Sequence, residues 1–286
     1  MGFWTAQEFS ALTFPDTSLV GDGLFHHKAR LMLAGETGIG KSYIAFQMAC
    51  DLAAGRAWFD TWKVVRPLTV LYLQVEIAEG LLWRRARRLY GDDPPKGMTI
   101  WTPDEDEPVG EDEFWPVIAA RAADFDIIVF DPLYMIAEGE ENQVHTIRPA
   151  QKKFDAIRKE GNGHSIIIVH HTRKPSQGAA PTIDSIRGSS AWPGWCDTVM
   201  LAERKAADVR LSVVKARNRE SGAPKPLILR WNEEQPGPFL SAVAFAESDP
   251  LGFILEYIEE QGGEAGQAGV MSFLHEGKAL SRSAAD

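Results

Sequence analysis

The 286-residue chain has an ordinary globular composition, 44% hydrophobic and 24% charged, so it can bury a native-sized core in one substantial domain. A net charge of −10 argues against a protein that coats nucleic acid non-specifically, so any nucleic-acid contact must be local. Two cysteines exclude a disulfide framework and indicate a reducing, cytoplasmic setting. The first ten residues lack signal-peptide features, and no run of 18 apolar residues predicts a membrane span.

Apolar runs rich in β-branched residues alternate with longer helical patterns through the first two thirds of the chain. The predicted strands are 31–34, 69–75, 126–130 and 165–169, and the predicted helices are 41–54, 78–90 and 146–159. This alternation predicts parallel strands joined by right-handed crossovers, in a sheet covered on both faces. Between 91 and 110, many Pro, Asp and Glu residues predict an exposed loop.

The pattern changes near residue 198, where strand-like runs are joined by short connections. These runs are 198–202, 209–215, 227–231 and 239–245, and they predict an antiparallel extension of the sheet. The expected fold class is therefore α/β, with a mostly parallel sheet flanked by helices and an antiparallel extension, over residues 1–248. Residues 249–286 form a predicted short helical segment, which is either an incomplete winged-helix module or a packing tail.

A phosphate-binding motif lies between the first predicted strand and the first predicted helix. Eight consecutive residues match G-x-x-x-x-G-K-[ST]: Gly35, Glu36, Thr37, Gly38, Ile39, Gly40, Lys41 and Ser42. Glycines let the loop wrap around phosphate, and the following helix adds its positive end. Lys41 is expected on the β- and γ-phosphates and Ser42 on Mg²⁺. We include the adjacent Tyr43 in the expected nucleotide-binding set.

Two carboxylates end predicted strands that follow this motif. Asp131 ends an apolar strand, as in a Walker B strand, and is expected to hold Mg²⁺ together with Ser42. Glu76 ends the preceding strand, where it could polarise the water that attacks the γ-phosphate. Glu79 is close by, but it falls in a predicted helix, where a solvated charge is the usual explanation.

The order of these elements resembles the RecA-like ATPases, in particular the plasmid RepA-type hexameric replicative helicases and their relative DnaB. The resemblance covers residues 21–245 and rests on the phosphate loop, the strand ending at Glu76, and two further places. The first is the histidine pair His170 and His171 at a strand end. The second is Lys215-Ala216-Arg217, similar to the Lys-x-Arg of DnaB-type proteins.

The resemblance implies roles for these residues. His170 is expected to sense the γ-phosphate and pass its state to the next loop, where Lys174 and Arg187 are expected to contact single-stranded DNA. Arg217, with Lys215, is expected to reach into the neighbouring subunit's ATP site, which implies a homo-oligomeric ring, a hexamer in that family. Arg219 is a rival for the role of Arg217, because the glycine that usually follows the finger arginine comes later here.

The function expected is Mg²⁺-dependent ATP hydrolysis at subunit interfaces of a ring, coupled to single-stranded DNA. A replication or mobile-element protein would be its further partner, and no membrane contact is expected. The alternative is a KaiC-like regulatory ATPase that remodels a protein partner without unwinding nucleic acid. The acidic surface favours this alternative slightly, and a response of hydrolysis to DNA distinguishes the two.

Overall fold

The computed structural model describes residues 3–104, 106–136, 144–159, 163–173, 182–186, 190–219 and 221–243. The chain divides into two compact units, one formed by residues 1–174 and 181–242 and the other by residues 175–180 and 243–286. The first unit contains nearly all the described residues and carries the phosphate-binding motif. The helical segment predicted over residues 249–286 lies outside the described residues. No helix in the described part is long and apolar enough to cross a membrane.

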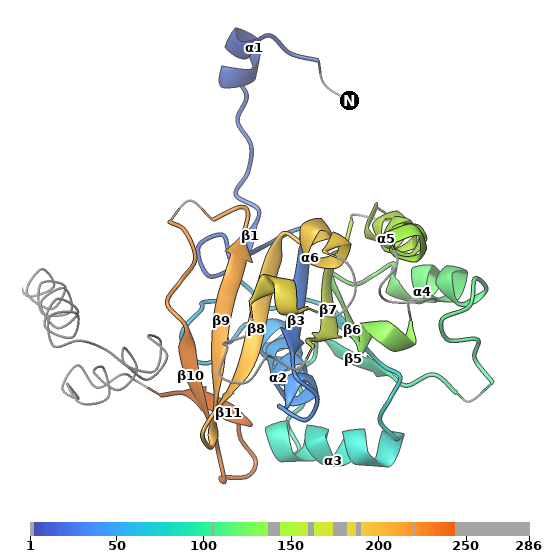
Figure 1. Ribbon diagram of the computed structural model, residues 1–286, viewed down its shortest axis with the longest axis vertical. Coiled ribbons are helices and arrows are strands. Elements are labelled where there is room, and N and C mark those ends of the chain that lie inside the picture. The colour runs from blue at the N-terminus through green and yellow to red at the C-terminus, as the bar shows by residue number, and fades with distance from the viewer. Residues whose placement is uncertain are drawn as a thin grey trace, which may run out of the picture. The chain divides into compact units, whose positions relative to one another are not determined.

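A nine-stranded sheet organises the first unit, in the order β11-β10-β9-β8-β3-β7-β6-β4-β5 (Figure 1). Its parallel strands are β3 (Arg30–Gly35), β4 (Val70–Gln74), β5 (Met98–Trp101), β6 (Ile127–Asp131), β7 (Ser165–His171) and β8 (Thr198–Lys205). The antiparallel strands are β9 (Asp208–Ala216), β10 (Leu227–Trp231) and β11 (Leu240–Ala242). β3 lies in the interior of the sheet, with β7 on one side and β8 on the other. Both neighbours run parallel to β3, so the ends of β7 and β8 lie beside the corresponding ends of β3.

Helices cover both faces of this sheet because its strands are apolar on both faces. α2 (Lys41–Ala54) and α3 (Glu79–Tyr90) pack in one core cluster with strand residues such as Tyr72 and Val129. α4 (Phe114–Ala122), α5 (Val144–Lys159) and α6 (Ala191–Trp195) pack in the other, with the alternate residues Leu73 and Phe130. This alternation follows from the period of two in strand side chains.

Short elements complete the described fold. They are α1 (Ala6–Ser10), β1 (Ser18–Val20), β2 (Phe25–His26) and the 3₁₀ turns η1 (Leu133–Met135) and η2 (Ile183–Ser185). β1 and β2 form a separate two-stranded sheet. The Leu24 carbonyl, between them, accepts the Thr198 hydroxyl at 2.6 Å, so this small sheet lies where β8 begins.

The parallel strands give the sheet two different edges. Their carboxyl ends form one, where Gly35 lies beside His171 and Gln74 beside Asp131 in register. Their amino ends form the other, where Arg30 begins β3. We call these the carboxyl edge and the amino edge. In open sheets of this kind, ligands bind outside the carboxyl ends of the strands.

The fold class predicted from the sequence is confirmed, and α2 has the predicted bounds. One local prediction is wrong: the acidic, proline-rich stretch 91–110 contains β5, the last strand of the sheet. β5 is only four residues long and pairs with β4 alone. A strand with one partner and flanking prolines does not show the continuous apolar run by which the inner strands are recognised.

Candidate nucleotide site

The phosphate-binding loop connects β3 to α2 at the carboxyl edge. Gly38 and Gly40 have φ values of 79° and 96°, which residues with side chains rarely adopt. Gly35 has no room for a side chain, because a Cβ there would lie 2.6 Å from the Ala202 carbonyl oxygen. α2 begins at Lys41, so its unpaired N–H groups and the positive end of its dipole face the loop. Backbone and helix together therefore suit a bound phosphate.

Lys41 and His171 meet inside this loop. Lys41 is 6% exposed, and its ammonium donates to the Glu36 carbonyl oxygen at 2.7 Å. The Lys41 ammonium also lies 3.2 Å from Nδ1 of His171, which in turn lies 3.3 Å from the Thr37 hydroxyl. Because an ammonium can only donate, Nδ1 of His171 is the acceptor and the ring carries its proton on Nε2. Two side chains thus converge where a P-loop receives the terminal phosphates.

Asp131 ends β6 and is completely buried. One of its carboxylate oxygens accepts the Ser42 hydroxyl at 3.0 Å. The other accepts the Tyr72 hydroxyl at 2.5 Å and the Gln74 amide at 3.0 Å. Burial raises the pKa of the Asp131 carboxyl, and the hydrogen bonds from Tyr72 and Ser42 oppose that rise. Asp131 is therefore fixed in one orientation, directed at the start of α2.

The pair formed by Ser42 and Asp131 fits Mg²⁺, which prefers hard oxygen ligands. Among the described residues, no three His, Cys, Asp or Glu side chains form a metal cluster. Mg²⁺ usually takes one or two protein ligands and completes its shell with waters and phosphate oxygens, so Ser42 and Asp131 suffice as its protein ligands. Ser42 and Asp131 would hold the ion, which when bound offsets phosphate charge.

Glu76 lies two residues beyond β4, with its side chain exposed at the carboxyl edge. Its carboxylate accepts the Tyr134 hydroxyl at 2.9 Å. The Gln74 side-chain oxygen accepts the N–H groups of Glu76 and Ile77 at 2.7 and 3.1 Å. The Tyr134 ring centroid lies 5.4 Å from that of His171, so Glu76 is connected to the phosphate loop through two aromatic side chains. The geometry suits Glu76 for activating a water near the γ-phosphate.

The two histidines of β7 have different surroundings. Ile166 and Ile168 pack in the cluster with α5, whereas Ile167 and Val169 pack in the cluster with α2. By the same alternation, His170 belongs to the α5 face, where it is 1% exposed, and His171 belongs to the α2 face. The sequence favoured His170 as the phosphate sensor, whereas in the structure it is the Nδ1 atom of His171 that lies 3.2 Å from the Lys41 ammonium.

Lys215 and Arg217 lie at the amino edge, at the opposite end of β3 from the phosphate loop. Thr198 pairs with Ala216 across the β8–β9 ladder, and β8 runs parallel to β3. The N–H of Arg217 donates to Asp197, whose own N–H donates to the carbonyl of Arg30. The end of β9 is therefore beside the start of β3.

Arg217 is held in place by acceptors of its own chain. Its guanidinium donates to Asp197 at 2.8 Å and to the Gly194 carbonyl at 3.1 Å. Asp197 also accepts Nε of Arg30 at 3.1 Å. Although burial raises the pKa of Asp197, the two arginines hold it below its usual value. The Lys215 ammonium donates to the Gly194 carbonyl at 3.2 Å, and burial lowers its pKa, with Arg217 adding to this shift.

The remaining candidates divide between described and undescribed positions. Arg219, the rival for the finger role, donates to the Gly222 carbonyl at 2.6 Å and also lies at the amino edge. Lys174 and Arg187, the predicted DNA contacts, lie outside the described residues. Between the described residues near them, Thr172 bridges Ile186 in antiparallel fashion, directly after His171.

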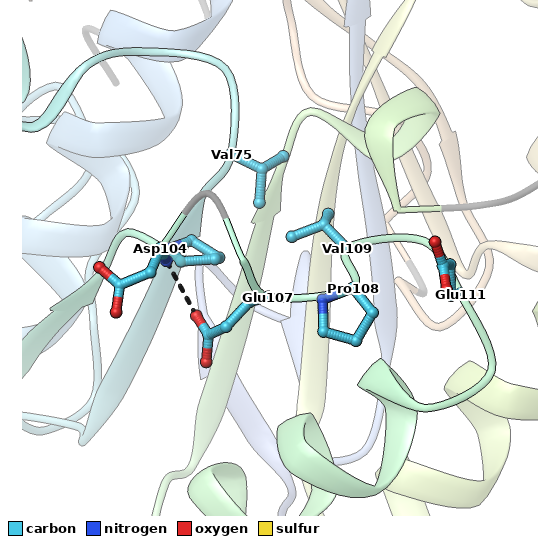
Figure 2. A pocket seen from close by; sticks show the side chains of 7 residues that line it. Val75, Asp104, Glu107, Pro108, Val109 and Glu111 are labelled. Carbon is cyan, nitrogen blue, oxygen red and sulfur yellow. Dashed lines mark hydrogen bonds between the residues drawn. The ribbon is translucent and has the colours of Figure 1, made fainter.

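A pocket of 320 Å³ lies beside this site, bounded in part by Val75, the neighbour of Glu76. Figure 2 shows three acidic side chains around it, Asp104, Glu107 and Glu111. Glu107 accepts the backbone N–H of Asp104 at 3.1 Å. Carboxylates disfavour an anionic ligand, so this pocket does not compete with the glycine loop for phosphate.

The sequence did not single out four of the residues in this constellation: Tyr72, Gln74, Tyr134 and, as a phosphate-loop contact, His171. Tyr72 and Gln74 share one face of β4, and polar side chains on that face of an otherwise apolar strand were the available signal. Nothing local identifies Tyr134. The ring of Tyr43, which belongs to the expected nucleotide-binding set, lies under the Arg85 guanidinium at 4.0 Å and 5.5 Å from the Trp231 ring.

Comparisons with known proteins agree with this geometry. A family model described as an AAA domain matches residues 2–177, more than half of the chain. A KaiC-like protein from Pyrococcus horikoshii is similar in fold, with a TM-score of 0.54, 15% identity and coverage of 80% of this chain and 100% of that chain. The flagellar accessory protein FlaH from Methanocaldococcus jannaschii has a TM-score of 0.51, 14% identity and coverage of 76% and 90%. No curated protein sequence matches.

Proposed function

We propose, from the premise that this chain belongs to the AAA domain family of RecA-like P-loop ATPases, that it hydrolyses ATP at sites shared between neighbouring copies in a ring. We propose further that hydrolysis is coupled to binding of, or movement along, single-stranded DNA, as the resemblance to RepA-type helicases implies. The observation that carries the proposal is the position of Arg217 at the amino edge, opposite the phosphate loop.

The separation of the two edges supports a shared site. β3 has six residues, and at about 3.3 Å per residue it spans roughly 20 Å between Arg217's neighbour Arg30 and the loop. The Arg217 side chain cannot cover that distance within one chain. A head-to-tail contact, which brings the amino edge of one copy to the carboxyl edge of the next, supplies the arginine in trans.

The chemistry follows from the residues at this shared site. Glu76 accepts a proton from the attacking water, since its carboxylate is exposed at the carboxyl edge and oriented by Tyr134. Lys41 and the neighbour's arginine stabilise the charge that develops on the transferred phosphoryl group. His171 contacts Lys41, so it is the residue that detects the presence of the terminal phosphate.

A short connection favours coupling to a ligand in the ring channel. His171 ends β7, and the bridge between Thr172 and Ile186 begins at the next residue. The loop expected to carry Lys174 and Arg187 therefore starts one residue from the side chain that contacts the P-loop lysine. Movement of His171 on hydrolysis would be passed to that loop without an intermediate element.

A second candidate is a KaiC-like ATPase that remodels a protein. It is favoured by the structural similarity to a KaiC-like protein and by the net charge of −10, which does not favour nucleic acid. The two candidates share the ATP site and the ring, and they differ in whether DNA accelerates turnover.

The test measures ATP turnover per chain over a range of protein concentrations, with and without single-stranded DNA, for the wild type, Arg217→Ala and Lys41→Ala. Measured separately, each variant should lose ATP turnover, but Arg217→Ala should still bind ATP. Mixing the two variants should restore part of the activity. The Arg217→Ala chain keeps Lys41, and its site can then receive Arg217 from a neighbouring Lys41→Ala chain. Arg219→Ala tests the rival arginine, and Arg66→Ala serves as an exposed arginine control.

Turnover that rises with concentration, recovers on mixing and increases with DNA supports the whole proposal. Recovery on mixing without a DNA effect supports the KaiC-like candidate instead. Turnover that is independent of concentration and unaffected by Arg217→Ala would overturn the shared site.

A further inference from the structure

We infer that the N-terminal arm of one copy docks on α3 of the neighbouring copy and joins successive subunits of the ring. The arm is residues 3–17, and the α3 patch is Leu81, Trp83 and Arg84. The inference rests on the head-to-tail arrangement of the proposed function and adds a surface that the ATP site does not include.

The arm is apolar but has no core to cover it. Every residue from 3 to 17 is exposed. Its large apolar side chains are Phe3, Trp4, Phe9, Leu12 and Phe14, with exposed fractions of 101%, 51%, 56%, 36% and 67%. A reciprocal capping box between Thr5 and Glu8 begins its single helical turn, and the Phe9 and Phe14 rings lie 6.0 Å apart. An exposed apolar group of this size marks an interaction surface.

The α3 patch is the second exposed apolar surface. α3 buries Leu82, Ala86 and Leu89 against the sheet and directs Leu81 and Trp83 to solvent, at 52% and 62% exposure. A tryptophan in this position is unusual for the solvent face of a helix, and tryptophan is among the residues enriched at the centres of interfaces.

The arm and the α3 patch are complementary in charge as well as apolar. The first 27 residues contain no Lys or Arg, and the arm carries Glu8 and Asp16. α3 contains four arginines, of which Arg84 is exposed and forms no ion pair within the described part of the chain. An acidic apolar arm and a basic apolar helix face are complementary in both respects.

The positions of the two surfaces match the proposed head-to-tail contact. The arm enters β1, and this small sheet lies at the amino edge, where the Thr198 hydroxyl donates to the Leu24 carbonyl. α3 starts at Glu79, five residues after β4 ends, so Leu81 and Trp83 in its first turns lie toward the carboxyl edge. A neighbour that presents Arg217 to the phosphate loop therefore presents its arm on the side of α3.

Docking within one chain is not what the structure shows. The arm and the α3 patch belong to the same chain, yet Phe3 and Trp83 both remain exposed. A second copy of the chain carries the complementary surface, since each subunit has one arm and one α3 patch. Repeating such a heterologous contact closes a ring when the rotation between successive copies closes.

Cysteine cross-linking tests the inference directly. The only two native cysteines, Cys50 and Cys196, are both buried, so an introduced surface cysteine dominates the reaction. A tagged Phe9→Cys variant is mixed with an untagged Trp83→Cys variant in Mg²⁺ and ATP and mildly oxidised. Tagged–untagged disulfide dimers should form at least about tenfold more than with Val65→Cys, an equally exposed control, because docking raises the effective concentration.

A second measurement avoids cysteines. Trp83→Ala and Phe9→Ala should each raise the protein concentration at half-assembly about tenfold or more in sedimentation velocity, the usual effect of removing a central aromatic from an interface. Both positions are exposed, so the variants keep their fold.

The outcomes separate this inference from the proposed function. Tagged–untagged cross-linking no greater than that of the Val65→Cys control overturns docking between copies. Recovery of activity in the Arg217→Ala and Lys41→Ala mixture without the cross-link leaves the shared site intact and rejects the arm. A specific cross-link without DNA stimulation keeps the arm and rejects the DNA motor.

Discussion

Gln74 donates its side-chain amide to Asp131 at 3.0 Å while its side-chain oxygen accepts the N–H of Glu76 at 2.7 Å. One uncharged side chain therefore fixes both the carboxylate expected on Mg²⁺ and the turn that presents the expected general base. Both contacts depend on an amide, which donates and accepts at once. A carboxylate cannot donate, and an aliphatic side chain can do neither.

Gln74→Leu should therefore lower kcat about 10- to 100-fold, the usual effect of losing a group that orients metal ligands. Nucleotide affinity should change little, because the glycine loop is untouched. Single-turnover hydrolysis and nucleotide titration measure the two quantities. Gln151→Leu, which removes a hydrogen bond to Ala191 away from the site, is the matched control. Equal kcat in the wild type and Gln74→Leu would show that Asp131 and Glu76 need no such support.

The two histidines should respond differently to substitution. His171→Ala removes the contact with Lys41 and should lower kcat about 100- to 1,000-fold, the usual effect of losing a polar group that acts in the transition state. His170→Ala leaves a space in a buried position and should reduce the free energy of unfolding by about 1–3 kcal/mol. Steady-state kinetics and denaturant unfolding of both variants check this. The reverse pattern would assign the sensing role to His170.

Two glycines of the phosphate loop offer a test of steric fit. A Cβ at position 38 would meet open space. The free energy of unfolding of Gly38→Ala should therefore fall only because of the positive φ, by roughly 1–2 kcal/mol. Gly40→Ala also places a Cβ 2.7 Å from the Trp231 ring, which should add about 1–3 kcal/mol for overpacking. Denaturant unfolding measures both. Trp231→Ala should recover the added part in the double variant, and failure of that rescue would contradict the steric explanation.

Asp51 should make stability depend on pH. Burial raises the pKa of its carboxyl to about 7, although Arg56 opposes the rise. The unfolded chain has the ordinary value of about 3.9, so the folded state binds more protons between these values. The stability that this group contributes is fully present below about pH 4 and is lost as pH rises through about 7.

Asp51→Asn stays neutral at every pH, so it should remove this loss and exceed the wild type in stability at pH 8, by on the order of a few kcal/mol. Urea unfolding at pH 5 and pH 8 measures the difference. Asp126→Asn is the control of opposite sign, because hydrogen bonds from Arg66 and Thr69 overcome burial and lower the pKa of Asp126. Parallel pH profiles for wild type and Asp51→Asn would rule the effect out.

The local parts of this structure could be predicted from the sequence. α2 begins after Gly40 and ends before Gly55, which adopts a φ of 69°, so glycines that mark a helix start and stop gave its bounds. The inner strands were found because burial on both faces leaves an unbroken apolar run. β5 was missed because it lacks such a run. α4, whose N-cap residue Glu113 makes no side-chain capping hydrogen bond, was not predicted either.

Contacts between distant segments could not be predicted in the same way. The Tyr72–Asp131 hydrogen bond joins residues 59 positions apart, and it depends on the register of β4 against β6, which no local pattern specifies. The choice between His170 and His171 did have a signal in the sequence. The apolar period of β7 divides the two residues between the sheet faces, and the P-loop helix covers only one of them.

Asp197 contacts both Arg217, at the end of β9, and Arg30, the first residue of the strand that ends in the phosphate loop. In an isolated subunit, the Arg217 guanidinium is therefore paired with a carboxylate of its own chain. In the proposed ring, a neighbour's nucleotide would compete with Asp197 for this arginine. Asp197 would then keep one of its two cations, Arg30, at the start of the strand that ends in the phosphate loop.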